Sequence, residues 1–149
     1  MRAIVQRVRE AKVKIKGKTV GEIGHGLLVL IGIIESDDNR IMEWMCNKLV
    51  NLRIFRDSEG NKNKSVLDIN GGILIVSNYT VYGSVKKGFR PNYMKSAPAE
   101  ISEPLYNRLI EYLRKKYPIN IKDGEFGAMM DIELINDGPV TIVIDKENN

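Results

Sequence analysis

The chain has 149 residues, 43% of them hydrophobic and 28% charged, and a formal net charge of +4. This length fits a single domain, residues 1–149, with a hydrophobic core that needs no disulfide or metal to hold it together. The composition is ordinary for a soluble globular protein, and no apolar run is long enough to span a bilayer. Charged residues interrupt the first ten positions too early for a secretory signal, so we expect a cytoplasmic protein with no membrane partner.

Cysteine and histidine are nearly absent from the sequence. Cys46 is the only cysteine and His25 the only histidine. One chain therefore cannot form an internal disulfide, a cysteine-based zinc site or a multi-histidine metal centre. A serine–histidine–aspartate triad would have to use His25, which lies in a glycine-rich turn. We expect no metal and no cofactor, so hydrolytic chemistry here must use other groups.

Three short segments carry much of the positive charge: Lys12–Lys18, Lys86–Arg90 and Arg114–Lys116. Such clusters suit a polyanion such as RNA. A solvated strand face and cations at a helix C-terminus explain the same clusters without any ligand. Charge alone does not separate the two interpretations.

The N-terminal third of the chain predicts strands. Residues 3–8 and 11–16 are strand-like, and lysines alternate with apolar residues in the second run. Gly17 and Lys18 then give a turn toward another strand. Residues 27–34 are apolar throughout, which predicts a buried strand.

The next segment predicts a helix and a hairpin. Asp37–Asn39 can cap a helix that runs to about Leu52, and Cys46 lies on its apolar stripe. A cysteine in that position is typical of a core residue and not of a nucleophile. Residues 53–66 then predict a short strand, a turn at 59–61 and a returning strand.

The second half of the chain begins with a central strand at residues 73–83 that turns polar midway. Residues 84–100 are basic and irregular, and a loop of this length is often functional. Ser102 is predicted to cap a second helix, with Pro104 in its first turn, and Pro118 ends that helix.

The last part of the chain predicts two strands, residues 129–134 and 140–144, joined by a hairpin turn at Asn136–Gly138. Pro139 is unusual at this position because it has no N–H to give to the following strand. Short, mostly hairpin-like connections favour an α+β fold with a largely antiparallel or mixed sheet and two main helices.

Two segments are candidates for the site. The polar run Ser77–Thr80 ends an apolar strand, as strands often do at a site or an interface, although a strand that simply emerges into water looks the same. The hydroxyls of Ser77 and Thr80 are candidate nucleophiles, but neither has an evident base nearby. Phe126 and Met130 are core residues or line a pocket, and Arg7 orders a neighbouring loop or lies at the surface.

The sequence resembles the D-aminoacyl-tRNA deacylases over nearly its whole length. The segments that carry the resemblance are "SNYT" at Ser77–Thr80, "RP" at Arg90–Pro91 and "NDGPVT" at Asn136–Thr141, together with "QRV", "GEIG" and "RIFRDSEG" nearer the N-terminus. The family's first signature is Ser-Gln-x-Thr, and this chain has Asn78 in place of the glutamine.

The resemblance implies a homodimer with active sites at the subunit interface, acting on the ester between a D-amino acid, or glycine, and the 3′ end of tRNA. It implies that Ser77, Asn78 and Thr80 form the catalytic strand end, with backbone N–H groups for the oxyanion and the tRNA 2′-hydroxyl helping to activate water. It also implies a cis peptide between Gly138 and Pro139, inserted from the partner subunit, which leaves no room for an L side chain. Tyr79, Phe126 and Met130 are then expected around the substrate, with Arg7 orienting the motif.

Three alternatives remain open on sequence alone. Thr80 is the nucleophile of an esterase; the protein is a non-catalytic RNA-binding module that uses the aromatic and basic residues of 86–95; or it is a hydrolase of small esters that does not need nucleic acid.

Overall fold

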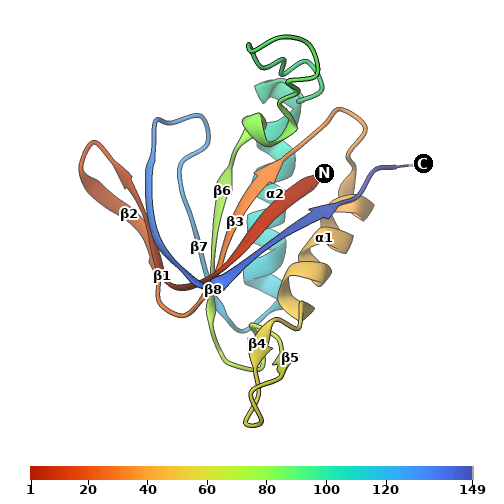
Figure 1. Cartoon of the computed structure of the whole chain (residues 1–149). Helices are drawn as coiled ribbons and strands as arrows, with labels where there is room; N and C mark the ends of the chain where they lie inside the picture. The colour runs from red at the N-terminus through yellow and green to blue at the C-terminus, as the bar shows by residue number, and fades with distance from the viewer. Residues whose placement is uncertain (149) are drawn as a thin grey trace.

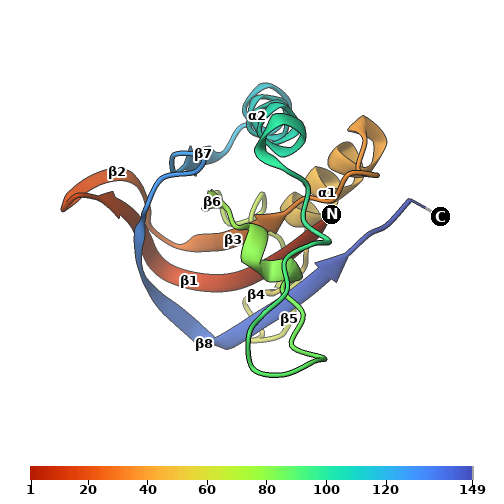
Figure 2. The ribbon, with the colours of Figure 1, turned by 90° about the horizontal axis from the view of Figure 1, so that it is seen from above.

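The computed structural model describes residues 1–148 and has an α+β fold, as the sequence predicts. A curved six-stranded sheet, closed nearly into a barrel, carries two helices against one side (Figures 1 and 2). Its order is β2-β1-β3-β6-β7, and β8 pairs with the other edge of β1 from Arg2 to Lys14. The elements are β1 (Arg2–Ile15), β2 (Lys18–Ile23), β3 (Gly26–Gly32), α1 (Asn39–Asn51), β4 (Phe55–Arg56), β5 (Lys62–Lys64), β6 (Gly72–Ser77), the 3₁₀-helix η1 (Tyr79–Tyr82), α2 (Ala99–Lys116), β7 (Asn120–Asp123) and β8 (Asp131–Asp145).

The sheet is mixed, and the connections explain why. β1 runs antiparallel to β2, β3 and β8, and short turns join it to β2 and join β2 to β3. β3 and β6, and then β6 and β7, run parallel. Parallel neighbours need a long crossover, and the chain supplies one through α1 and another through α2. The small β4–β5 hairpin, with its turn near Gly60, forms a separate sheet, as predicted.

The predicted hairpin at Asn136–Gly138 is wrong. Residues 131–145 form one long, bent strand, and both of its halves pair with β1: Thr141 lies opposite Gln6, and Leu134 lies opposite Ala11. The register shifts between these two stretches, on the β1 side at Gln6–Glu10. The two strand-like runs at 3–8 and 11–16 are likewise one strand, β1, long enough to pair with both halves of β8.

The start of α1 is as predicted, and the start of α2 is not. The Asp38 carboxylate accepts the Ile41 N–H at 3.0 Å and so caps α1. α2 begins earlier than predicted, after Pro98, which is the cap residue although it offers no side-chain bond. Ser102 lies one turn inside α2, where its hydroxyl donates back to the Pro98 carbonyl at 3.1 Å, and Pro104 is also inside the helix.

The core fills the space between the sheet and the two helices. Cys46 is fully buried in α1 beside Met42 and Leu109. Burial raises the pKa of its thiol to about 12, so Cys46 is a core residue, as expected, and holds no reactive thiolate. A second cluster, centred on Leu74, Val76 and Val13, packs inside the curl of the sheet. Within residues 1–148, no helix is long and apolar enough to cross a membrane.

Asp38→Ala is expected to lower the midpoint of thermal unfolding by about 2–4 °C at neutral pH, because the Ile41 N–H loses its acceptor. That hydrogen bond holds the pKa of Asp38 below its ordinary value. A depressed pKa in the folded state means that the contribution is present above the ordinary value and is lost as the pH falls through the lowered one. The difference between the two proteins should therefore shrink in acid. Asp38→Asn, which can also cap, should stay close to the unsubstituted protein at neutral pH; an equal loss in both variants would contradict the capping role.

Candidate active site

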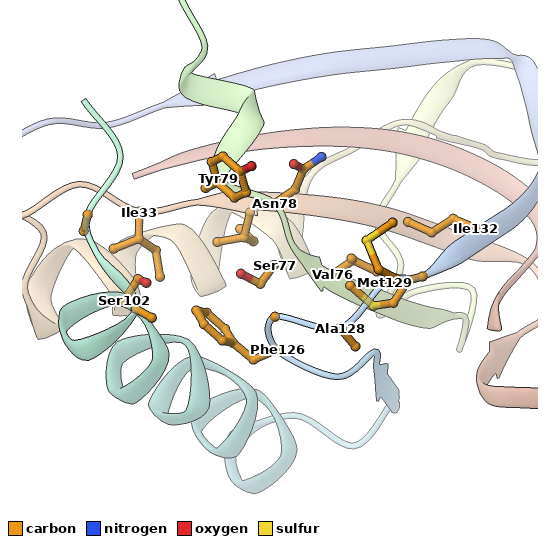
Figure 3. A pocket seen from close by; sticks show the side chains of 15 residues that line it. Ile33, Val76, Ser77, Asn78, Tyr79, Ser102, Phe126, Ala128, Met129 and Ile132 are labelled. Atoms are coloured by element: carbon orange, nitrogen blue, oxygen red, sulfur yellow. The ribbon is translucent and has the colours of Figure 1, made fainter. Parts of the chain in front are cut away.

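The candidate site is a cavity of about 700 Å³ beside the carboxyl end of β6. Three elements enclose it: the β6–η1 junction, the start of α2, and the loop at residues 124–130 that joins β7 to β8 (Figure 3). Five of the predicted site residues line it, namely Ser77, Asn78, Tyr79, Phe126 and Met130. Ile33, Ala97 and Ser102 complete part of its wall, and the sequence prediction missed all three.

The backbone at the end of β6 turns sharply because of Asn78. Its N–H donates to the Ile31 carbonyl at 2.8 Å, which keeps the strand ladder to β3 intact up to this residue. Its side-chain oxygen accepts hydrogen bonds from the N–H (3.1 Å) and the hydroxyl of Thr80. Asn78 thereby caps η1, which begins at Tyr79. The Asn78 side chain is thus used to shape its own turn.

The groups available for chemistry at this turn are mostly main-chain atoms. Within residues 1–148, the N–H groups of Asn78 and Thr80 both have acceptors, whereas the N–H of Tyr79 has none. The Thr80 hydroxyl donates to the Asn78 amide oxygen, which is not a base, and the Ser77 hydroxyl has no hydrogen-bond partner among the described residues. Neither hydroxyl is therefore activated as a nucleophile within this protomer.

The opposite wall of the cavity is apolar and rests on the core. The rings of Phe126 and Tyr106 lie 5.8 Å apart, and the Tyr106 hydroxyl donates to the Ile75 carbonyl at 3.1 Å. Gly124 leaves space for Met130, because a Cβ there would lie 2.6 Å from the Met130 sulfur. Met129 next to it is 92% exposed. The cavity therefore has one polar wall, one apolar wall and an apolar rim.

Four predicted site residues, Arg7, Thr80, Gly138 and Pro139, do not line this cavity. Gly138 and Pro139 are exposed at the bend of β8, and the peptide bond between them is cis. Thr80 lies on η1, one residue beyond the lining segment. One protomer therefore brings together the strand-end and loop residues but leaves the Gly138–Pro139 segment apart from them.

Arg7 is bonded to the bend of β8. The side chain is 3% exposed. Its Nε donates to the Asp137 carbonyl at 3.2 Å, and its Nη1 donates to the Ile54 carbonyl at 2.6 Å. The Asp137 carboxylate also lies 3.2 Å from the Arg7 Nε, 3.6 Å from Arg9 and 3.8 Å from His25. Arg7 and Asp137 are far apart along the chain, so no local sequence pattern predicts this pairing.

The Asn136 side chain supplies hydrogen-bond donors next to Pro139, which has no N–H to give to the β1–β8 pairing. Its side-chain Nδ2 donates to the carbonyls of Arg7 and Val140, each at 3.0 Å. These bonds fix both sides of the bend, because one joins it to β1 and the other spans the Gly138–Pro139 pair. Gly138 has a φ of +125°, a conformation that L residues rarely adopt. The exposed segment is thus rigidly held from behind by buried and half-buried side chains.

Over residues 1–148, no group of three or more His, Cys, Asp or Glu is placed to hold a metal ion. The fold and the cavity define a small α+β protein whose candidate site is built from a strand-end main chain, hydroxyls and an apolar loop.

Comparison with known proteins identifies the family. The sequence profile of the D-Tyr-tRNA(Tyr) deacylases matches residues 4–145. A D-aminoacyl-tRNA deacylase of Thermosipho africanus (strain TCF52B) is 48% identical over 147 residues, 99% of this chain and 98% of that protein. Another, from Bacteroides thetaiotaomicron, is 50% identical over 148 residues, with 99% of both chains covered. This chain belongs to the D-Tyr-tRNA(Tyr) deacylase family and is a hydrolase, which confirms the resemblance.

Two solved structures share the fold of this chain. One described as c-Myc DNA unwinding element binding protein is 43% identical, superposes with a TM-score of 0.94, and is matched over 99% of this chain and 100% of its own. A probable eukaryotic D-amino acid tRNA deacylase shares the fold at 20% identity, with a TM-score of 0.80 over 97% of this chain and 98% of its own.

Proposed function

We propose that this protein hydrolyses the ester of D-aminoacyl-tRNA, and of tRNA mischarged with glycine, to release the free amino acid and tRNA. The observation that carries the proposal is the family match over residues 4–145, together with relatives that are about half identical over their full length and carry the name D-aminoacyl-tRNA deacylase. The cavity supports it, since a strand-end main chain faces an apolar loop across a space large enough for an aminoacyl group.

The complete site is made by two copies of the chain. Gly138 and Pro139 are exposed and held from behind by Arg7 and Asn136, yet they do not line the candidate cavity of their own protomer. Exposed apolar side chains flank them on β8, with Ile135 49% and Val143 60% exposed. The cavity rim carries exposed Tyr79 and Met129. An isologous dimer would cover both apolar surfaces and place the bend of one β8 at the cavity of the other.

Catalysis rests on positioning and on main-chain electrostatics. An aminoacyl ester is already an activated acyl group, so the enzyme has to hold it, stabilise the oxyanion and admit water. The unoccupied Tyr79 N–H is the oxyanion donor that this protomer offers. The 2′-hydroxyl of the terminal ribose assists the attacking water, which fits two side-chain hydroxyls, Ser77 and Thr80, that have no base beside them.

Discrimination between D and L substrates works by exclusion. The partner's exposed Gly138–Pro139 main chain lies against the α-carbon of the substrate and leaves no volume for a side chain in the L position. Glycine passes because it has no side chain. Different D side chains are accepted because they point away from the excluding backbone.

Thr80→Ala is expected to keep kcat within about tenfold of the unsubstituted enzyme, whereas a substrate with a 2′-deoxy terminal adenosine should lose at least about a hundredfold. The reason is that the Thr80 hydroxyl only donates to Asn78, whereas the 2′-hydroxyl takes part in the reaction. Single-turnover rates with purified D-tyrosyl-tRNA measure both effects. Complete inactivity of Thr80→Ala, with full activity toward the deoxy substrate, would instead identify Thr80 as the nucleophile.

The function itself is tested by incubating the purified protein with matched D- and L-tyrosyl-tRNA and measuring the free tyrosine released. We expect release from the D substrate and almost none from the L substrate. Binding without release would identify a non-catalytic RNA-binding module. Equal hydrolysis of a small tyrosyl ester, with no requirement for RNA, would identify a general esterase.

A further inference from the structure

The loop Ser84–Lys95, which we call the basic strap, lies directly beside the candidate site. It begins after Gly83, whose N–H donates to the Thr80 carbonyl at 2.9 Å. It ends at Ser96, whose hydroxyl donates to the Tyr79 carbonyl at 2.7 Å, and the next residue, Ala97, lines the cavity. Both ends of the strap are therefore bonded to η1, at Thr80 and at Tyr79, next to the cavity. Figure 1 shows it, in green, projecting from the end of the molecule where η1 and the start of α2 meet.

The strap has a defined shape although it contains no helix or strand. Ser84 and Asn92 exchange two backbone hydrogen bonds, each of 2.8 Å, which close its base. The Asn92 side chain accepts the Met94 N–H at 2.8 Å. The rings of Tyr93 and Tyr79 meet edge to face with their centres 5.2 Å apart. The strap thus presents its side chains from a fixed base next to the catalytic turn.

The charge on the strap is positive, and of its four cations only Lys95 forms an ion pair within residues 1–148, with Glu147. No aspartate or glutamate occurs between residues 69 and 99. Lys86, Lys87 and Arg90 are exposed and form no ion pair with any residue from 1 to 148. The same three side chains line one shallow hollow of the surface together with Tyr93. A cluster of unpaired cations around a hollow is complementary to phosphate groups.

Exposed apolar side chains accompany these cations. Phe89 stands fully exposed, at 103%, between Lys87 and Arg90, and Met94 is 88% exposed. An aromatic ring displayed among cations is the arrangement that stacks on an unpaired nucleobase. The other occupant that apolar exposure suggests is a second copy of the chain. A two-fold contact through the strap would bring its cations against each other, which disfavours that occupant.

We infer that the basic strap binds the acceptor end of the tRNA, with Lys86, Lys87 and Arg90 on backbone phosphates and Phe89 against an unpaired base. This inference rests on the proposed function, because the aminoacyl ester in the cavity is attached to an RNA that must leave the cavity across a neighbouring surface. The strap is the surface fixed to the catalytic turn at both ends. The free energy of RNA binding to the strap thus helps to position the ester in the cavity, where only main-chain atoms of the protein recognise it.

The test compares two double variants of equal charge. Lys86→Ala/Lys87→Ala removes two strap cations, and Lys62→Ala/Lys64→Ala removes two exposed cations from β5, at the opposite end of the molecule (Figure 1). The ligand is an acceptor-stem RNA hairpin that has a single-stranded 3′ end and carries no amino acid. Its binding is measured by fluorescence anisotropy at several salt concentrations. The strap variant should bind about tenfold more weakly at low salt. Its plot of log affinity against log salt should become less steep, with the magnitude of the negative slope smaller by about 1.5–2. The β5 variant should keep the affinity and the slope of the unsubstituted protein.

Other measurements separate stacking, assembly and chemistry. Phe89→Ala should weaken binding without altering the salt slope, because it removes no charge. Hydrolysis of D-tyrosyl-adenosine, which has no stem, should be the same in the Lys86→Ala/Lys87→Ala variant and the unsubstituted enzyme. If neither protein hydrolyses any aminoacyl ester, the proposed function fails, and the hairpin affinities still decide the role of the strap.

Equal RNA affinity in the two double variants would overturn the inference. So would a strap variant that changes the sedimentation mass of the protein while leaving RNA affinity intact, since the strap would then be a contact between protein chains.

Discussion

Arg7→Ala is expected to lower kcat/KM for D-tyrosyl-tRNA by at least about a hundredfold and the free energy of unfolding by about 3 kcal/mol. The Arg7 guanidinium is almost fully buried and bridges the Ile54 carbonyl, the Asp137 carbonyl and the Asp137 carboxylate. Removing it leaves the two carbonyls without these donors and Asp137 without its most buried cation. The bend that carries Gly138 and Pro139 then loses its support from behind.

The stability loss and the activity loss can be separated with Arg7→Lys. Lysine keeps the positive charge but lacks the fork that reaches two carbonyls at once. We expect this variant to recover part of the unfolding free energy, measured by urea titration, and to remain defective in turnover. If Arg7→Ala were as active and as stable as the unsubstituted enzyme, Arg7 would have no orienting role.

Gly138→Ala is expected to lower kcat/KM for the D substrate by about a hundredfold. It should also lower the D/L ratio, which is kcat/KM for the D substrate divided by kcat/KM for the L substrate. Gly138 has a φ of +125°, where a side chain is strained, and a Cβ there would lie 3.0 Å from both the Arg7 Nη2 and the Val140 Cγ2. The backbone must shift to relieve these contacts. It is this backbone that we assign to excluding L side chains in the partner's cavity.

The matched control for Gly138→Ala is Gly60→Ala. Gly60 also has a positive φ, +82°, but an added Cβ meets nothing within 4 Å, and the residue lies in the distant β4–β5 turn. Gly60→Ala introduces only the strain of an L residue at positive φ, with no steric clash. It should therefore lower the free energy of unfolding without changing kcat/KM or the D/L ratio. If the D/L ratio were the same in Gly138→Ala as in the unsubstituted enzyme, selection would not depend on this backbone.

The local elements of the fold were predictable from sequence because short-range rules determine them. The Asp38 cap, the buried run that became β3 and the turn near Gly60 each depend on a few neighbouring residues. The bend of β8 was not predictable in this way. Asn136–Gly138 has hairpin chemistry, but β1 is long enough to pair with both flanking halves, and Asn136 supplies side-chain donors where Pro139 has none. Long-range pairing therefore prevailed over local turn preference.

The candidate site was predictable in part for the same reason. Ser77 and Asn78 were visible as a polar break in an apolar strand, and the structure places them at the cavity together with Phe126. The sequence pattern predicts Ser102 as a helix cap, but Ser102 lines the cavity from inside α2, because the helix already begins after Pro98. The Arg7–Asp137 contact depends on the pairing of the two ends of the chain, which no local pattern reveals.

Subunit complementation tests most directly whether main-chain atoms from two copies form one site. Ala128→Trp fills the cavity from its own loop, and Gly138→Ala distorts the segment supplied to the partner. Each variant alone should be nearly inactive. Co-expressed in equal amounts, they should regain about a quarter of the unsubstituted activity toward D-tyrosyl-tRNA, because half of randomly paired dimers carry one intact site of two. A mixture no more active than the two variants measured separately would show that one chain holds the whole site, and would contradict the account.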